Sequence, residues 1–242
     1  MEFAIQVCGW LVGLVLEILI LAALLRGEFK NFPFVFAYTL ANFLITVLEI
    51  PLTLNMRAHK PGSGSEYWFM WWYWRNEAVL QLLLFAVVIS LIYYAIERGR
   101  SRRIVLAGMI GGAILFAGIT FLIHYIPGAI SIGVWMTPWS RDLYVVSTVL
   151  DLALWARLIA AKRKDRRLLM LAGALGIQLT GEAIGESIRY VAVHLFHEAH
   201  RGQIPGNILI LLANLAAMYI WWQTFRTHPT TKEPPVARRL SN

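Results

Sequence analysis

The chain alternates between long apolar stretches and short segments that are charged or rich in turn-forming residues. Seven stretches are almost wholly apolar and reach roughly 20 residues, the length an α-helix needs to cross a hydrocarbon core about 30 Å thick. We expect helices over residues 4–25, 34–54, 74–96, 104–126, 143–159, 168–195 and 208–225. The pattern predicts an all-α integral membrane protein, built as a bundle of seven transmembrane helices.

The connections between these stretches are short. Most are marked by charge or by Pro, Gly and Ser, as at residues 26–31, 61–65, 97–103 and 161–167. We expect residues 131–142 to form a loop, and Pro205 to precede a last helix that has Asn207 as its N-cap. The short connections leave room for one transmembrane domain, residues 1–227, followed by a disordered polar cytoplasmic tail, residues 228–242.

Lysine and arginine residues are distributed unevenly between the two ends of the predicted bundle. Of the 22 in the chain, fifteen lie at one end, four at the other, and three fall within the apolar stretches. Because short cytoplasmic loops carry an excess of these residues, the N-terminus is predicted outside and the C-terminus in the cytoplasm. This orientation requires an odd number of spans and predicts a multi-pass protein of the plasma or inner membrane.

The composition agrees with residence in a bilayer. Apolar residues make up 58% of the chain and charged residues 15%, against roughly 45–50% and about 25% in soluble domains. The net charge of +8 arises mostly from the loop residues that set orientation, so we expect a lipid bilayer and not nucleic acid as a partner. The single cysteine, Cys8, excludes an intramolecular disulfide.

Six acidic residues fall within the predicted spans, where only three arginines accompany them. They are Glu17, Glu49, Glu77, Asp151, Glu182 and Glu186. A charged side chain in the bilayer is costly and usually faces the bundle interior or a water-filled cavity. Some of these carboxyl groups must therefore be protonated, hydrated or bound to a cation.

The sixth stretch holds the densest set of polar residues. At 3.6 residues per turn, one helix face carries Gln178, Glu182, Glu186, Arg189 and Tyr190. Gly181 and Gly185 form a small-xxx-small pair, which lets a second helix approach closely. We therefore expect this helix to present its polar face close to a neighbouring helix.

Two interpretations of these polar residues remain open. In the first they form an interhelical clasp, with Glu186 paired to Arg189, and Glu182 bonded to a polar group such as Asn42 or Asn214. In the second they form a site for a proton, a cation or another ligand, as ionisable groups within spans often do.

Depth in the predicted membrane favours a site. Polar residues of four spans lie near the outer end, whereas Asp151 and Glu182 lie closer to the midplane, so we infer a polar cavity that opens outward and narrows towards the middle. The candidate ligand-binding residues are Glu49, Arg75, Glu77, His124, Asp151, Glu182, Glu186, Arg189 and Tyr190.

The histidines near the end of the sixth stretch resemble a set of metal ligands. They are His194, His197 and His200, with Glu198 between them. Their spacing places at most two on one helix face, so we interpret them as solvated loop residues and assign no metal site. Retinal is excluded as a cofactor because all five lysines lie outside the predicted spans and none could form a Schiff base there. We expect no other cofactor.

These features favour a protein that senses or transports a small polar or cationic solute, or protons, through an outward-opening cavity. Sensing requires less movement than transport and ranks first, and it requires a protein partner because no output domain is visible. A non-catalytic membrane subunit of a larger complex is the alternative. The aromatic run 67–74 suits a membrane interface, the wall of a ligand cavity or a partner surface. A membrane-embedded metal-dependent enzyme, using His124 or the histidines at 194–200 with Glu186, is the second alternative.

Overall fold

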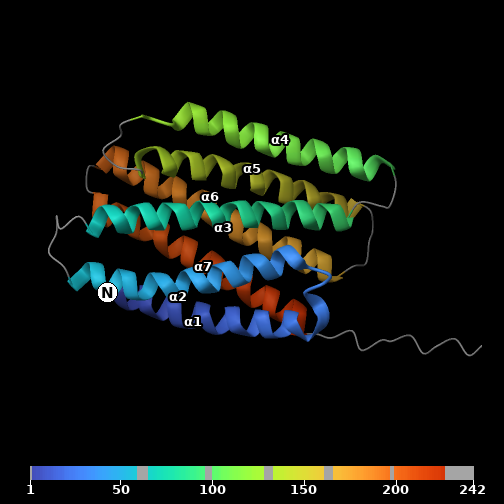
Figure 1. Cartoon of the computed structure of the whole chain (residues 1–242), viewed down its shortest axis with the longest axis horizontal. Coiled ribbons are helices and arrows are strands. Elements are labelled where there is room, and N and C mark those ends of the chain that lie inside the picture. The colour runs from blue at the N-terminus through green and yellow to red at the C-terminus, as the bar shows by residue number, and fades with distance from the viewer. Residues whose placement is uncertain are drawn as a thin grey trace, which may run out of the picture.

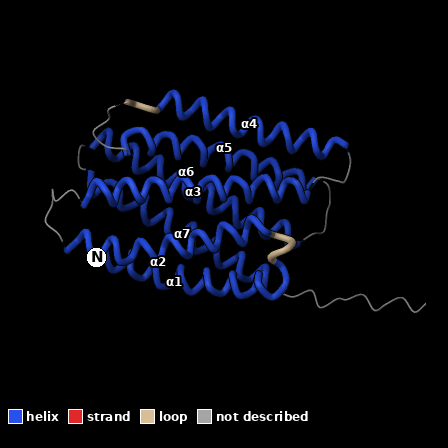
Figure 2. The backbone as a smooth tube through the Cα atoms, viewed as in Figure 1, coloured by secondary structure: helices blue, strands red, loops and turns tan. Residues whose placement is uncertain are grey.

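The computed structural model describes residues 2–58, 65–95, 100–127, 133–160, 166–196 and 199–226, and these are helical apart from short turns (Figure 2). The elements are α1 (Glu2–Ala23), η1 (Leu24–Glu28), α2 (Pro33–Ala58), α3 (Ser65–Ala95), α4 (Arg100–His124), α5 (Gly133–Ala160), α6 (Arg166–Phe196) and α7 (Ala199–Arg226). Each of the seven apolar stretches overlaps one α-helix. The predicted tail, residues 228–242, lies outside the described residues.

The helices run along a common long axis (Figure 1). α4 lies at one edge of the bundle beside α5, α1 and α2 lie at the opposite edge, and α6 packs most extensively against α7. The start of α1, the end of α2 and the start of α3 lie at the same end of the bundle (Figure 1). We call this the N-terminal end.

Six of the described helices are long and apolar enough to cross a membrane, namely α1 with η1, α2, α3, α4, α6 and α7. Many large apolar side chains are exposed on the bundle surface, among them Leu122 and Ile123 of α4. Lipid is the environment in which such a surface is stable. The prediction of an all-α, multi-pass membrane protein is confirmed, whereas the count of seven spans and the orientation stay predictions.

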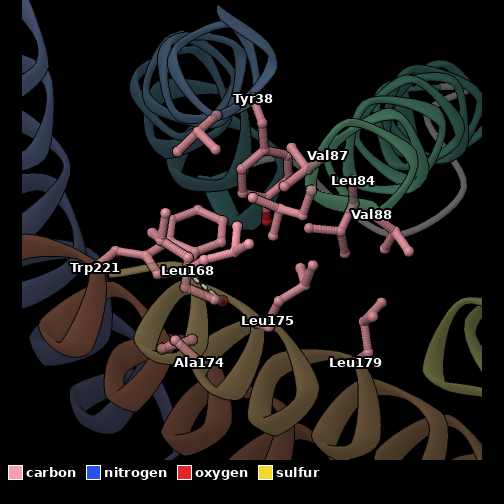
Figure 3. Close-up of a cluster of buried hydrophobic side chains, with 14 of the residues drawn as sticks. Tyr38, Leu84, Val87, Val88, Leu168, Ala174, Leu175, Leu179 and Trp221 are labelled. Atoms are coloured by element: carbon pink, nitrogen blue, oxygen red, sulfur yellow. Dashed lines mark hydrogen bonds between the residues drawn. The ribbon is translucent and has the colours of Figure 1, made fainter. Parts of the chain in front are cut away.

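An apolar core fills the half of the bundle away from the N-terminal end. Figure 3 shows part of it, where Val87 of α3 lies beside the ring of Tyr38 of α2 and Leu175 of α6 points towards them. Trp221 of α7 is 1% exposed and packs edge-on against the ring of Tyr38. This half of the bundle therefore contains the apolar core.

The chain turns sharply between α1 and α2. Gly27, inside the π-helical turn η1, has a φ of 132°, a conformation that side chains other than glycine rarely adopt. Glu28 then accepts a hydrogen bond at 2.9 Å from Arg167 at the start of α6. Pro33 opens α2, a position where its missing N–H costs nothing.

The loop predicted over residues 131–142 is wrong, because α5 begins at Gly133 and continues through Pro138. The indole N–H of Trp139 donates a hydrogen bond to the Ala117 carbonyl oxygen of α4 at 3.2 Å. Packing against α4 thus supports the first turns of α5, although proline removes one backbone hydrogen bond there.

The predicted start of the last helix is also wrong. α7 begins at Ala199, so Pro205 and Asn207 lie inside it and Asn207 is not an N-cap. The reason is a close approach to α6, because a Cβ placed on Gly206 would lie 2.7 Å from the carbonyl oxygen of Gly185. Contact with α6 at Gly206, directly after the proline, supports a helix that the local sequence alone does not favour.

Candidate functional site

Glycines bring α6, which carries two of the acidic residues, into close contact with α7. A Cβ placed on Gly181 would lie 2.1 Å from the Cβ of Ala213, and one on Gly185 would lie 2.4 Å from Cγ1 of Ile210. Real Cβ atoms do not approach so closely, so only glycine fits at either position. The small-xxx-small prediction for this helix is confirmed.

A cavity of about 430 Å³ lies between the helices towards the N-terminal end. It is lined by residues of α1, α2, α3, α5, α6 and α7, from Ile5 and Ile204 near the helix ends down to Tyr38 and Leu84 at the apolar core. Its polar lining consists of Gln6, Tyr38, Asn42, Thr46, Glu49, Tyr73, Glu77, Tyr144, Glu182, Glu186, Arg189, Asn207 and Asn214.

Five of the nine candidate residues line this cavity: Glu49, Glu77, Glu182, Glu186 and Arg189. Four are carboxylic acids and one is a guanidinium, and they come from α2, α3 and α6. The cavity therefore holds an excess of acidic groups over basic ones.

Arg189 pairs with one of the acids on its own helix. Its Nη1 lies 2.6 Å from Oε1 of Glu186, which is 5% exposed. The second oxygen of Glu186, Oε2, is buried and has no hydrogen-bond partner among the described residues. The Arg189 side chain also crosses close to Gly206, where a Cβ would meet its Cγ at 2.8 Å. Arg189 is thus held in place, and one oxygen of Glu186 is buried without a donor among the described residues.

Two further acids accept hydrogen bonds from other helices. Nδ2 of Asn214 on α7 donates to Oε1 of Glu182 at 2.6 Å, and the hydroxyl of Tyr144 on α5 donates to Oε1 of Glu77 at 2.7 Å. These bonds satisfy one oxygen of each carboxyl group. They also tie α6 to α7 and α3 to α5 at the level of the cavity.

Glu49 differs from the other three acids. No hydrogen bond or ion pair joins its carboxyl group to another of the described residues, although it lies on the cavity wall. Asn42 lies about two helical turns before Glu49 on α2. Its Nδ2 donates a hydrogen bond to Oε1 of Glu17 on α1 at 2.5 Å. Glu49 is therefore the acid with the greatest unmet capacity for a ligand.

Arg75 and His124 lie outside the cavity lining. The guanidinium of Arg75 stacks over the ring of Trp72, with its carbon 4.1 Å from the ring centroid. His124, at the end of α4, lies 2.8 Å from Asp142 of α5. Both residues thus make local contacts near the N-terminal end.

Tyr190 and Asp151 also lie outside it. Arg141 of α5 covers the ring of Tyr190 at 5.0 Å from its centroid. Asp151 is 1% exposed, and its side chain packs against Gly176 of α6. A Cβ placed on Gly176 would lie 2.8 Å from Oδ2 of Asp151. Four of the nine candidates are therefore not brought to the cavity.

Most of the histidine cluster predicted near the end of the sixth stretch lies outside the described residues. His197 and Glu198 lie outside the described residues, as do the side chains of His194 and His200. Within the part of the chain that the structure describes, no three His, Cys, Asp or Glu residues lie close enough to hold a metal ion.

The aromatic part of the cavity was predicted only for Tyr73, which belongs to the aromatic run 67–74. Tyr38, Tyr73, Tyr144 and Trp10 line it beside the acids. One signal was available, since Tyr73 precedes Glu77 by four residues and so shares its helix face. The other three had no such neighbour, and only the packing of the helices brings them to the cavity.

Comparisons with protein-family models, with curated proteins and with solved structures find no match to this chain.

Proposed function

We propose that the chain is a seven-span membrane protein with its N-terminus outside and its C-terminus in the cytoplasm, which binds a small organic cation in the cavity at the N-terminal end. The observation that carries this proposal is the acid excess of that cavity. Four carboxyl groups and one guanidinium line it, and neither Glu49 nor Oε2 of Glu186 has a hydrogen-bond or ion-pair partner among the described residues.

Electrostatics supports a cation as the ligand. An ionised carboxylate in a low-dielectric interior is costly unless a positive charge or hydrogen-bond donor compensates it. Arg189 compensates Glu186, which leaves Glu49, Glu77 and Glu182 without a positive side chain in the cavity lining. A cationic solute supplies what the protein lacks. Protonation of the same carboxyl groups is the competing way to remove their charge.

Size and lining favour an organic cation. Ligand cavities for small molecules occupy about 300–1,000 Å³, and this one, at about 430 Å³, lies near the lower limit. The rings of Trp10 and Tyr73 contribute to its wall. Aromatic faces attract cations, and most strongly where water is excluded.

The shape of the bundle favours sensing over transport. The cavity ends at Tyr38 and Leu84, and beyond them the apolar core closes the other half of the bundle. A transporter of this architecture has to open that core, whereas a sensor needs only a change in helix packing around the bound solute. Because the described residues form a single bundle, a sensor would pass its signal to a protein partner.

Choline and 3,3-dimethylbutan-1-ol, in which carbon replaces the charged nitrogen, have nearly the same shape and differ in charge. They therefore test whether the cavity recognises a positive charge. We expect choline to raise the thermal unfolding midpoint of the purified protein in lipid nanodiscs, and the isostere to leave it unchanged. The variant Glu49→Gln/Glu186→Gln should lose the response. Asp151→Asn is the matched control, since it removes a buried carboxyl group outside the cavity and should preserve the response.

Three results would contradict the proposal. An equal response to the uncharged isostere would show that charge is not recognised. A full choline response in the double glutamine variant would place binding elsewhere. No choline response in the wild type, together with unchanged stability of the double glutamine variant, would indicate that protonation alone neutralises the acids.

The topology is tested separately with reporter fusions in the predicted loops. We expect a fusion within residues 59–64 to be accessible from outside the cell, and one within residues 161–165 to be accessible only from the cytoplasm. The reverse pattern, or the same side for both, would overturn the orientation drawn from the basic residues.

A non-catalytic subunit of a larger complex remains the second candidate. The observation in its favour is that Glu182, Glu77 and Glu17 each accept a hydrogen bond from a different helix. Acids whose task is to fix the packing of helices need no solute. Co-purification of a constant partner, together with wild-type behaviour of the glutamine variants, would favour this role.

A further inference from the structure

Two acids of the cavity at the N-terminal end lie at different levels along the helix axes. Both α2 and α6 begin near Glu28 and run towards the N-terminal end (Figure 1). Their register is set by Nε2 of Gln178 on α6, which donates a hydrogen bond to the hydroxyl of Tyr38 on α2 at 2.5 Å. Glu49 follows Tyr38 by eleven residues, whereas Glu182 follows Gln178 by four. At a rise of about 1.5 Å per residue, Glu49 lies about 10 Å closer to the N-terminal end than Glu182.

Each of these two acids has an oxygen that no described residue satisfies. No hydrogen bond or ion pair joins Glu49 to another of the described residues. Glu182 accepts the amide N–H of Asn214 with Oε1, but its Oε2 has no partner in the described part of the chain and is not fully enclosed by protein. The Glu182 side chain lines the cavity and is only 8% exposed. Because a buried carboxylate needs a positive charge or a donor, each level of the cavity suits one cationic group.

The cavity wall between the two levels includes apolar side chains from α2 and α7. On α2, Ile45 lies about one turn before Glu49, on the side towards the apolar core. On α7, Leu211 lies about one turn before Asn214, the donor to Glu182, and thus closer to the N-terminal end. A ligand that reaches both acids therefore passes an apolar surface along its middle.

The number of charges in the cavity favours two positive groups over one. Glu186 is compensated by Arg189 of the same helix. Glu77 is close enough to interact electrostatically with both Glu49 and Glu182. A ligand with one positive charge would compensate only one of these three acids. A ligand with two leaves only Glu77, whose Oε1 already accepts a hydrogen bond from α5.

We propose that the cation bound in this cavity is a linear aliphatic diamine of about five carbons, with one ammonium group at Glu49 and the other at Glu182. This inference rests on the proposed function and narrows its class of ligand. With C–C bonds of about 1.5 Å, the two nitrogens of an extended pentane-1,5-diamine lie about 7.5 Å apart. Each ammonium group contacts a carboxylate oxygen at about 2.8 Å, so this length spans the two levels. Its methylene groups pack against Ile45 and Leu211.

The test compares pentane-1,5-diamine with pentylamine, which has the same chain but only one ammonium group. Thermal unfolding of the full chain is followed against amine concentration, in nanodiscs of lipid without net charge. We expect the diamine to reach half of its maximal stabilisation at a concentration at least about tenfold lower than pentylamine. The nitrogens of propane-1,3-diamine lie about 5 Å apart. This shorter diamine reaches both acids only at the limit of contact, so it should bind at least about threefold more weakly than pentane-1,5-diamine.

Two variants with a matched control complete the test. Glu49→Gln and Glu182→Gln each remove one of the two acids, so each should reduce the affinity for the diamine to that for pentylamine. Asp151→Asn removes a buried carboxyl group outside the cavity and should preserve the advantage of the diamine. If Glu182→Gln does not fold, Glu49→Gln still tests the proposal, because Glu49 has no hydrogen bond to another described residue to lose.

The outcomes separate this inference from the proposed function. If choline stabilises the protein but the diamine has no advantage over pentylamine, the inference is overturned and the proposed function stands. If neither choline nor either amine stabilises the protein, both are overturned. An advantage of the diamine that persists in Glu49→Gln, or that is lost equally in Asp151→Asn, would show that the two acids are not its binding groups and would overturn the inference.

Discussion

The α6–α7 contact makes the sharpest stability prediction, because a single methyl group tests it. In Gly181→Ala the new Cβ would lie 2.1 Å from the Cβ of Ala213, and the next atom, the Ala213 Cα, lies at 3.6 Å. The obstructing atom is a short side chain fixed to the backbone of α7, so it has no rotamer by which to move. The two helices have to separate, at the level where Glu182 contacts Asn214.

The magnitude follows from that geometry. Overpacking of a tightly packed interface costs about 1–3 kcal/mol. A clash between two Cβ atoms, neither of which can rotate away, belongs near the upper limit of that range. Alanine gains about 1 kcal/mol over glycine in helix propensity, which offsets part of the cost. We therefore expect Gly181→Ala to lower the free energy of unfolding by about 2 kcal/mol. Adding Ala213→Gly removes the obstructing Cβ and leaves Cα at ordinary contact distance. The double variant should recover most of the loss.

The assay is reversible unfolding in mixed detergent micelles, applied to both single variants and the double variant as a thermodynamic cycle. Gly173→Ala is the matched control on the same helix, since its Cβ would meet only Nε1 of Trp155, at 3.9 Å. This control should be neutral or slightly stabilising. If Gly181→Ala were as stable as Gly173→Ala, or if Ala213→Gly failed to rescue it, the close approach of α6 and α7 would be refuted.

Three further predictions are tested by the same unfolding measurement. Asn214→Leu leaves the Glu182 carboxyl group without its donor and should cost about 1–3 kcal/mol; a neutral result would show that water replaces the amide. Gly27→Ala imposes a side chain on a φ of 132° in open space, so it should cost about 1–3 kcal/mol by backbone strain alone, whereas Gly108→Ala, equally open but helical, should cost nothing. Glu28→Gln removes a partly exposed ion pair with α6 and should cost less than about 1 kcal/mol; a larger loss would assign that pair a structural role.

The seven helices could be predicted from the local sequence because a bilayer offers no hydrogen-bond partners to the backbone. Backbone polar groups within hydrocarbon have to be hydrogen-bonded to other protein groups, and an apolar stretch of about 20 residues meets this requirement by itself when it forms an α-helix. The spacing of Gly181 and Gly185 likewise identified the contact face of α6, because a close approach needs small residues one turn apart. These features depend only on neighbours along the chain.

The helix boundaries of α5 and α7 show where local reasoning failed. Pro138 and Pro205 are ordinary signals of a helix start or a loop, yet both lie inside helices. Trp139 and Gly206 pack against neighbouring helices and stabilise turns that the prolines disfavour. Signals of this kind act between helices, so they cannot be read from one segment.

The candidate site likewise has one part that the sequence predicted and another that only the packing of the helices determined. The sequence by itself identified the acids within the spans and the shared face of Glu182, Glu186 and Arg189, because helical periodicity fixes which side chains of one helix lie together. Only the tertiary structure decided that Glu49 and Glu77 join them, while Asp151 fits against a glycine of α6. The physical reason is that the rotation of each helix about its own axis is set by packing against its neighbours, and in a mostly apolar span the pattern of apolar residues leaves that rotation undetermined.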